Sequence, residues 1–382
     1  MVQRKDFFIE LKDWSKRKLR IVGKYLDGFS KILGSSSNMP VYYVDGFAGR
    51  GTYERGEKGS PVIAAELAEC YRDESKSYRL YCINVENDLD NFTNLQAETN
   101  GFGNLVYNYS GTFMDNLDAI LSHIGICPTL FFLDDFGVSG IDWGIVEKLL
   151  RRKGTTDLWI RFDHKTVRRL DGFFTSGAKG ADQKFAHLPQ LYGINDPFYL
   201  HQRLDGSTPQ VRMQNTLSLY LEQLEKTFQS SKKIGFAAAY PIFSLGKQLK
   251  YHMVFTCAHQ KAARLASDIV NSEDDIYQRE RQEYIGCRTH QMSLFPLDPT
   301  PEEILIEKIS LLKTQIQKHF FGQTLFRSDL HYQLLCIDNK YWFGRIGSTH
   351  LTKVLEELKS EAKLVILNNA PLSKDDTKLI FR

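Results

Sequence analysis

Short apolar runs alternate with segments of helical periodicity along the first part of the chain. Helical spacing of apolar residues first appears at residues 7–33, where Leu11, Trp14 and Leu19 recur among lysines and arginines. Strands that alternate with helices predict a parallel sheet covered by helices on both faces. The expected strands lie at residues 40–45, 78–85, 105–109, 129–134 and 156–162. The expected helices between them lie at residues 60–71, 89–95, 111–121 and 143–150.

Residues 165–230 interrupt this alternation and are interpreted as a helical or irregular insertion. Its basic and aromatic residues suit a lobe that contacts a substrate, and an ordinary surface insertion fits equally well. Two further strands are expected at 234–240 and 248–257, close together as in a hairpin. Five alternating strands and a late strand pair are the order expected of a Rossmann-like methyltransferase sheet, in contrast to the six-stranded dinucleotide-binding fold.

The last part of the chain has a different pattern. Three helices are expected at 301–320, at 327–335 and from 348 onward, followed by strands at 363–367 and 378–382. Three helices followed by a two-stranded wing predict a winged helix-turn-helix. The sequence therefore predicts a domain at 1–270, a linker at 271–300 and a winged-helix domain at 301–382.

Length and composition agree with two globular domains. The chain has 382 residues, of which 42% are hydrophobic and 25% are charged. Its net charge of +3 neither requires nor excludes a nucleic-acid partner, because basic residues can still cluster locally. No signal peptide or membrane-spanning run is expected. The six cysteines form no CxxC pair, which disfavours a zinc site or a disulfide framework and suits a cytoplasmic protein.

The first candidate site is the glycine-rich turn after the first strand. Glycines there would let a nucleoside ligand approach the backbone, although a tight turn also needs glycine for steric reasons. Glu86, at the end of the second strand, is expected to accept the ribose hydroxyls, and nearby Asp88 is an alternative. Thr112 and Phe113, after the third strand, are expected beside the adenine, although Phe113 fits a core position equally well. The candidate residues in the turn are Asp45, Gly46, Phe47, Ala48, Gly49 and Gly51.

The second candidate site follows the fourth strand, at Asp134, Asp135, Phe136 and Gly137. Adenine-N6 and cytosine-N4 methyltransferases carry an Asp/Asn-Pro-Pro-Tyr/Phe tetrad at this place. An acidic group followed by an aromatic ring can bind an exocyclic amino group and stack on its base. A strand-end turn that binds nothing is the alternative.

These motifs together resemble the three-Cys-motif partner proteins (TcmP family). The resemblance rests on residues 43–54, on Gly59-Ser-Pro61, on Glu86, on residues 133–137 and on residues 246–257, and covers roughly 10–265. The end of the chain resembles the GMT-like winged helix found in these proteins. The family usually has Asp-Pro-Phe/Tyr-Gly after the fourth strand, so Asp135 departs from its pattern. Lys18 also matches the family pattern. We expect it to be a solvated lysine on a helix, and a lysine that faces the cofactor carboxylate is the alternative.

The resemblance implies an S-adenosylmethionine-binding Rossmann fold and a partner protein with three clustered cysteines, similar to radical-SAM proteins. Our first hypothesis is methyl transfer to a nucleobase amino group in DNA or RNA, with Asp134 orienting the amine. In this hypothesis the winged helix contacts nucleic acid through Lys353, Lys359, Lys363 and Lys374. The second hypothesis is an accessory module that binds the cofactor or a nucleotide without catalysis and partners the three-cysteine protein in DNA repair, modification or phage defence. The third is a metal enzyme that uses Asp134 and Asp135, for which no further acidic cluster appears.

Overall fold

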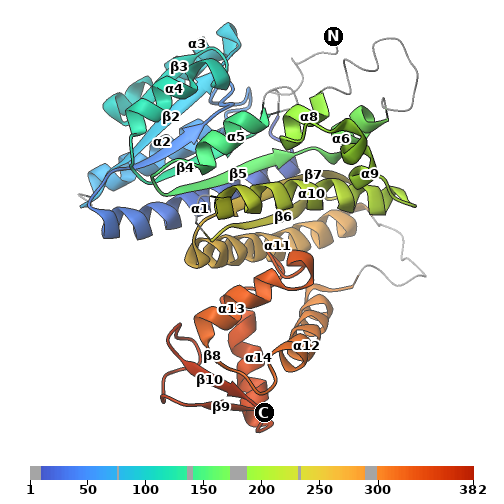
Figure 1. Cartoon of the computed structure of the whole chain (residues 1–382). Helices are drawn as coiled ribbons and strands as arrows, with labels where there is room; N and C mark the ends of the chain where they lie inside the picture. The colour runs from blue at the N-terminus through green and yellow to red at the C-terminus, as the bar shows by residue number, and fades with distance from the viewer. Residues whose placement is uncertain (1–9, 75–76, 136–140, 173–186, 231–233, 289–298) are drawn as a thin grey trace. The chain divides into compact units, whose positions relative to one another are not determined.

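The computed structural model describes residues 10–74, 77–135, 141–172, 187–230, 234–288 and 299–382. The chain divides into two compact units (Figure 1). Unit 1 comprises residues 1–244 and 249–259, and unit 2 comprises residues 245–248 and 260–382. Among the described residues, no helix is long and apolar enough to cross a membrane.

Unit 1 contains a seven-stranded sheet in the order β3-β2-β1-β4-β5-β7-β6. The pairs among β1 to β5 are parallel, whereas β7 runs antiparallel to both β5 and β6. This order confirms the predicted α/β class and the Rossmann-like methyltransferase sheet with its late strand pair. The strands are β1 (Val41–Asp45), β2 (Leu80–Glu86), β3 (Val106–Ser110), β4 (Thr129–Leu133), β5 (Thr156–Phe162), β6 (Phe236–Phe243) and β7 (Leu249–Cys257).

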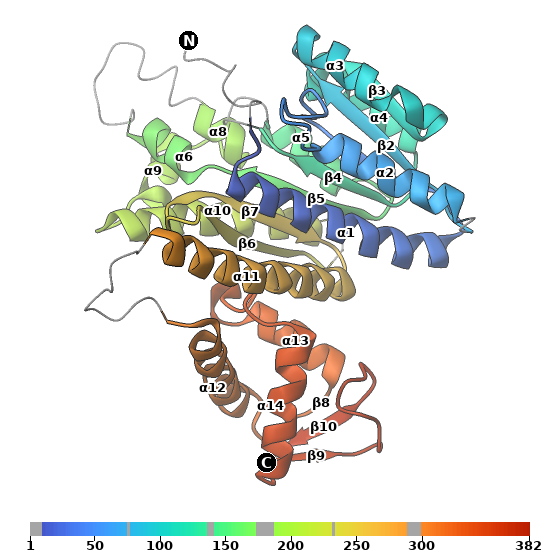
Figure 2. The ribbon, with the colours of Figure 1, turned by 180° about the vertical axis from the view of Figure 1, so that it is seen from behind.

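Helices cover both faces of this sheet. Helices α5 and α10 lie in front of it in Figure 1, and α1 and α2 lie in front of it after the half-turn to Figure 2. The helices between strands are α1 (Asp13–Ser37), α2 (Ser60–Asp73), α3 (Leu89–Thr99), α4 (Phe113–Ile124) and α5 (Trp143–Leu150), and a 3-10 turn, η2 (Asn100–Leu105), precedes β3.

The buried strands explain this layering. All residues of β1 and β4 are buried, as expected for parallel strands that are covered on both sides. Alternate strand residues such as Val44, Val85 and Leu133 pack with α4, α5 and α10 in one continuous core. On the opposite face, Tyr25 of α1 packs edge-on against Trp159 of β5.

The insertion predicted at 165–230 is wrong in part. Its last helix, α10, contributes Leu219, Tyr220, Leu224 and Phe228 to the core. It is therefore the helix that follows β5 in the chain and covers the sheet before β6 begins, and is not part of an insertion. The additional material is therefore shorter and consists of residues before α10. The helices of this segment are α6 (His164–Asp171), α8 (His187–Tyr192), α9 (Pro197–Leu204) and α10 (Pro209–Ser230).

The linker predicted at 271–300 is also wrong in part. Helix α11 (Gln260–Arg288) runs through the first half of the predicted linker, where Asn271, Glu273 and Tyr277 are buried among polar residues. Residues 289–298 lie outside the described residues. The helix belongs to unit 2, so this unit begins earlier than predicted.

The rest of unit 2 follows the predicted helices and strands. A short strand, β8, was not predicted, and it completes an antiparallel sheet in the order β8-β10-β9. The elements are α12 (Pro301–Phe320), β8 (Thr324–Phe326), α13 (Arg327–Cys336), the 3-10 turn η3 (Asp338–Lys340), α14 (Ser348–Ser360), β9 (Leu364–Ile366) and β10 (Lys378–Phe381).

Candidate functional site

The turn after β1 is held to the ends of the neighbouring strands. The Gly46 amide donates to the Phe132 carbonyl at 3.0 Å, and the Ala48 amide donates to the Val85 carbonyl at 2.9 Å. The Asp45 carboxylate accepts the Phe47 amide at 3.2 Å below the turn. Burial raises the pKa of the Asp45 carboxyl to about 6, although hydrogen bonds from Ser60 and Phe47 act in the opposite direction. Asp45 therefore supports the turn from inside the protein.

The glycines of the turn serve different purposes. A Cβ atom at Gly46 would lie 2.9 Å from Leu133 Cδ2, so packing against the core explains this glycine. Gly49 and Gly51 have φ angles of 65° and 88°, a backbone conformation that residues other than glycine rarely adopt. Gly46 and Ala48 are buried, whereas Phe47 and Gly49 are partly exposed. Of the residues predicted to face a cofactor, Gly46 is thus better explained by packing.

Glu86 lies directly beside this turn. Its Oε2 atom accepts the Gly49 amide at 2.8 Å, and its Oε1 atom accepts the Asp88 amide at 2.7 Å. Asp88 caps helix α3, where its side chain accepts the Asp90 and Asn91 amides. The structure thus brings together the two predicted elements, the glycine turn and the strand-end carboxylate, and gives the alternative residue Asp88 a capping role.

The predicted adenine contact at Phe113 is not supported. Phe113 is buried in the core as the first residue of α4, and Thr112 is its N-cap, whose hydroxyl accepts the Asp115 amide at 3.1 Å. Two apolar residues that the sequence analysis missed are instead exposed at these strand ends. Leu89 is 71% exposed after β2, and Met114 is 63% exposed after β3. The sequence did offer a signal for these two residues. Each is an apolar residue in the first turn of a helix, where polar residues are usual.

Asp134, at the carboxyl end of β4, is paired within the protein. Its Oδ2 atom accepts a hydrogen bond from Lys18 Nζ, and Arg161 Nη1 of β5 lies 3.8 Å from its Oδ1 atom. The expectation that Lys18 is solvated is wrong, because only 4% of the residue is exposed. Asp135 is partly buried, and Phe136 and Gly137 lie outside the described residues.

Aromatic side chains surround this ion pair. The Arg161 guanidinium lies 4.6 Å from the centre of the Tyr251 ring, and Lys18 Nζ lies 5.7 Å from the centre of the Phe132 ring. Burial, and then the charge of Asp134, raises the pKa of the Tyr53 and Tyr251 hydroxyls. The carboxyl ends of β4 and β5 therefore carry a buried charged group with an aromatic border.

Asp134 and Asp135 do not form a metal site with other acids. Within the described ranges, no three His, Cys, Asp or Glu side chains are grouped so that they could hold a metal ion. Lys18 and Arg161 already supply positive charge to Asp134, which disfavours a cation there.

In unit 2, the four lysines predicted to contact nucleic acid, Lys353, Lys359, Lys363 and Lys374, are exposed. Acidic residues lie among them, and Lys363 pairs with Glu361 at 2.8 Å.

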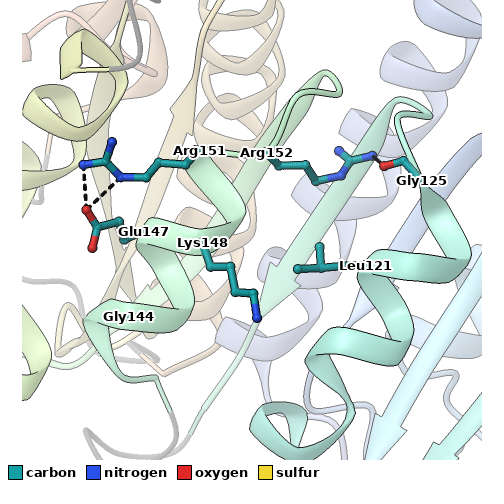
Figure 3. A pocket seen from close by; sticks show the side chains of 7 residues that line it. All are labelled: Leu121, Gly125, Gly144, Glu147, Lys148, Arg151 and Arg152. Carbon is teal, nitrogen blue, oxygen red and sulfur yellow. Dashed lines mark hydrogen bonds and ion pairs between the residues drawn. The ribbon is translucent and has the colours of Figure 1, made fainter.

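A separate open groove of about 480 Å³ lies between α4 and α5 (Figure 3). Its charged groups are paired: Arg151 binds Glu147 at 2.7 Å, Lys148 binds Asp118, and Arg152 donates to the Gly125 carbonyl at 3.0 Å. None of the residues that line the groove is a predicted site residue, so we do not assign it to the candidate site. They are Leu121, Gly125, Gly144, Glu147, Lys148, Arg151 and Arg152.

No family model and no curated protein matches the chain. Solved structures that resemble it include the O-methyltransferase from Bacillus cereus in complex with SAH, at 12% identity over 62% of this chain and 80% of that one, with a TM-score of 0.32. The O-methyltransferase TomG from Streptomyces achromogenes, in complex with SAM, shares 11% identity over 66% of this chain and 93% of its own, with a TM-score of 0.33. At these TM-scores the likeness adds nothing to what the strand order gives.

Proposed function

We propose that unit 1 binds S-adenosylmethionine at the carboxyl ends of β1 and β2 and transfers its methyl group to an acceptor held near Asp134. The observation that carries the proposal is the hydrogen bond between the Gly49 amide and the Glu86 carboxylate. It joins an open backbone turn to a partly exposed acid, which is the arrangement that binds an adenosine ribose in dinucleotide folds.

The residues at this edge fit an adenosyl group. Each Glu86 oxygen accepts one backbone amide and retains a lone pair for a ribose hydroxyl. Leu89, after β2, and Met114, after β3, offer exposed apolar surface at these strand ends for the adenine ring, in place of the buried Phe113. Bound S-adenosylmethionine would supply an electrophilic methyl group, and the protein's task is then to position the acceptor.

A nucleobase amino group is the acceptor we favour. The Asp134 carboxylate accepts hydrogen bonds only, so it suits an N–H donor. Tyr53 and Tyr251 lie near it, since burial and then its negative charge raise the pKa of both hydroxyls. Asp134 Oδ1 is screened from bulk water in this structure, so an acceptor reaches it only after neighbouring groups move. A base in DNA or RNA would have to be flipped or single-stranded to enter.

Unit 2 is proposed to hold the nucleic acid as a winged helix. Lys353 and Lys359 on α14, and Lys363 and Lys374 beside and between the strands β9 and β10, would contact phosphates. A three-Cys-motif protein is the partner that the sequence resemblance suggests.

The second candidate is an accessory module that binds the cofactor without methyl transfer. The pairing of Asp134 with Lys18 and Arg161 favours it, because the carboxylate is already engaged. Asp135, where the family has proline, favours it as well.

Two measurements on the full chain test these proposals. Calorimetric titration with S-adenosylhomocysteine should give one site per chain, and the absence of binding would refute both candidates. Transfer of labelled methyl from S-adenosylmethionine to single-stranded DNA or RNA should then occur, and Asp134→Asn should abolish it while preserving cofactor affinity. Binding without transfer, even with the partner present, would leave the accessory module.

A further inference from the structure

Lys18 is a buried charged residue beside the proposed acceptor site, and the proposed reaction gives it no role. It lies on the inner face of α1 between Arg17 and Leu19, and it reaches Asp134 at the end of β4. A buried ion pair is expensive to desolvate, and apolar residues of similar volume often stabilise a fold at least as well. Stability alone therefore does not explain a lysine at this position.

Asp134 carries a second unexplained feature. Its Oδ1 atom is buried and has no hydrogen-bond partner within the described part of the chain, while Arg161 at 3.8 Å is too distant for a hydrogen bond. An unsatisfied buried oxygen is costly, and in native proteins it calls for an explanation such as a catalytic role. Lys18 thus fixes one oxygen of the carboxylate and leaves the other without a hydrogen-bond donor.

We propose that Lys18 is a positioning residue for methyl transfer, which holds Asp134 by Oδ2 so that Oδ1 binds an N–H group of the acceptor. This inference rests on the proposed function. It restricts the acceptor to groups that donate a hydrogen bond, such as an exocyclic amino group, and excludes carboxylate oxygens. The acceptor nitrogen forms the new bond to the methyl carbon, the methyl–sulfur bond breaks, and the nitrogen's proton passes to Asp134.

The test compares Lys18→Met and Lys18→Arg with Lys31→Met, which removes an exposed lysine of the same helix that pairs with Asp27. We expect Lys18→Met to lower kcat about 100-fold, the loss typical of a displaced catalytic group, with unchanged affinity for S-adenosylhomocysteine. Arginine at position 18 should restore most of the rate, because its guanidinium can also hold the Asp134 carboxylate.

Wild-type rates in Lys18→Met would overturn the positioning role while leaving the proposed function intact. A wild-type protein that binds S-adenosylhomocysteine but methylates nothing would refute the proposed catalysis, and the role of Lys18 with it. Loss of cofactor affinity in Lys18→Met, checked against an unchanged circular dichroism spectrum, would assign Lys18 to the cofactor instead.

Discussion

Replacement of Glu86 by glutamine tests the central contact of the candidate site. Glutamine has one acceptor oxygen, so it can satisfy the Gly49 amide or the Asp88 amide, but not both as the carboxylate does. A hydrogen bond to a charged group contributes about 1.5–3 kcal/mol, and partial exposure of Glu86 reduces this to about 1–2 kcal/mol. For a unit of this size, the melting temperature should fall by about 2–8 °C.

The same substitution should weaken S-adenosylhomocysteine at least tenfold, because a ribose hydroxyl loses a charged partner. Calorimetry gives the affinity, and thermal unfolding followed by circular dichroism gives the stability. The control is Glu69→Gln, which removes a surface ion pair with Arg72 and should change stability by less than about 1 kcal/mol. A Glu86→Gln protein with lowered stability and undiminished cofactor affinity would show that Glu86 only supports the turn.

Three further substitutions or conditions probe the fold. Gly51→Ala should destabilise unit 1 by about 1–2 kcal/mol in urea titration, because φ is 88° and the new Cβ would lie 3.2 Å from Glu98 Cβ; an unchanged midpoint would contradict this strain. Burial, and then the charges of Arg264 and Arg327, lowers the pKa of His331 from 6.5 to about 3. Between these values only the unfolded chain takes up the proton, so the contribution of His331 to the stability of unit 2 should fall by about 1.4 kcal/mol per pH unit as the pH drops, and His331→Phe should remove this contribution. Arg152→Met should lower stability by about 2–3 kcal/mol, since its guanidinium donates to the Gly125, Cys127 and Thr155 carbonyls; a loss below 0.5 kcal/mol, a threshold set by ordinary surface substitutions, would show that water replaces these bonds.

The strands of unit 1 could be predicted because each is a short apolar run between polar turns. The run at 129–134 and the strand β4 differ by only one residue, since burial on both faces leaves no polar position within it. The role of helix α10 as a core helix was not predicted, because its four core residues are separated by polar residues within a long segment. Strand β8 is only three residues long, too short for any periodic pattern.

At the site, the sequence predicted what local motifs encode and missed what tertiary contacts decide. Gly49 and Glu86 meet because the ends of β1 and β2 are neighbours in a parallel sheet, which the strand order already implies. Lys18 is distant in sequence from Asp134, and a lysine on a charged helix gives no local sign of burial. Phe113 and Met114 are adjacent apolar residues, and only the orientation of α4 determines which of them faces the core.

Hydrogen–deuterium exchange of the full chain, with and without saturating S-adenosylmethionine, tests most directly whether the adenosyl group binds at the Gly49–Glu86 edge. We predict that the ligand slows exchange in peptides that cover residues 45–51 and 86–90, and leaves unit 2 unchanged. Slowed exchange confined to other segments, or no change at saturating ligand, would contradict the account.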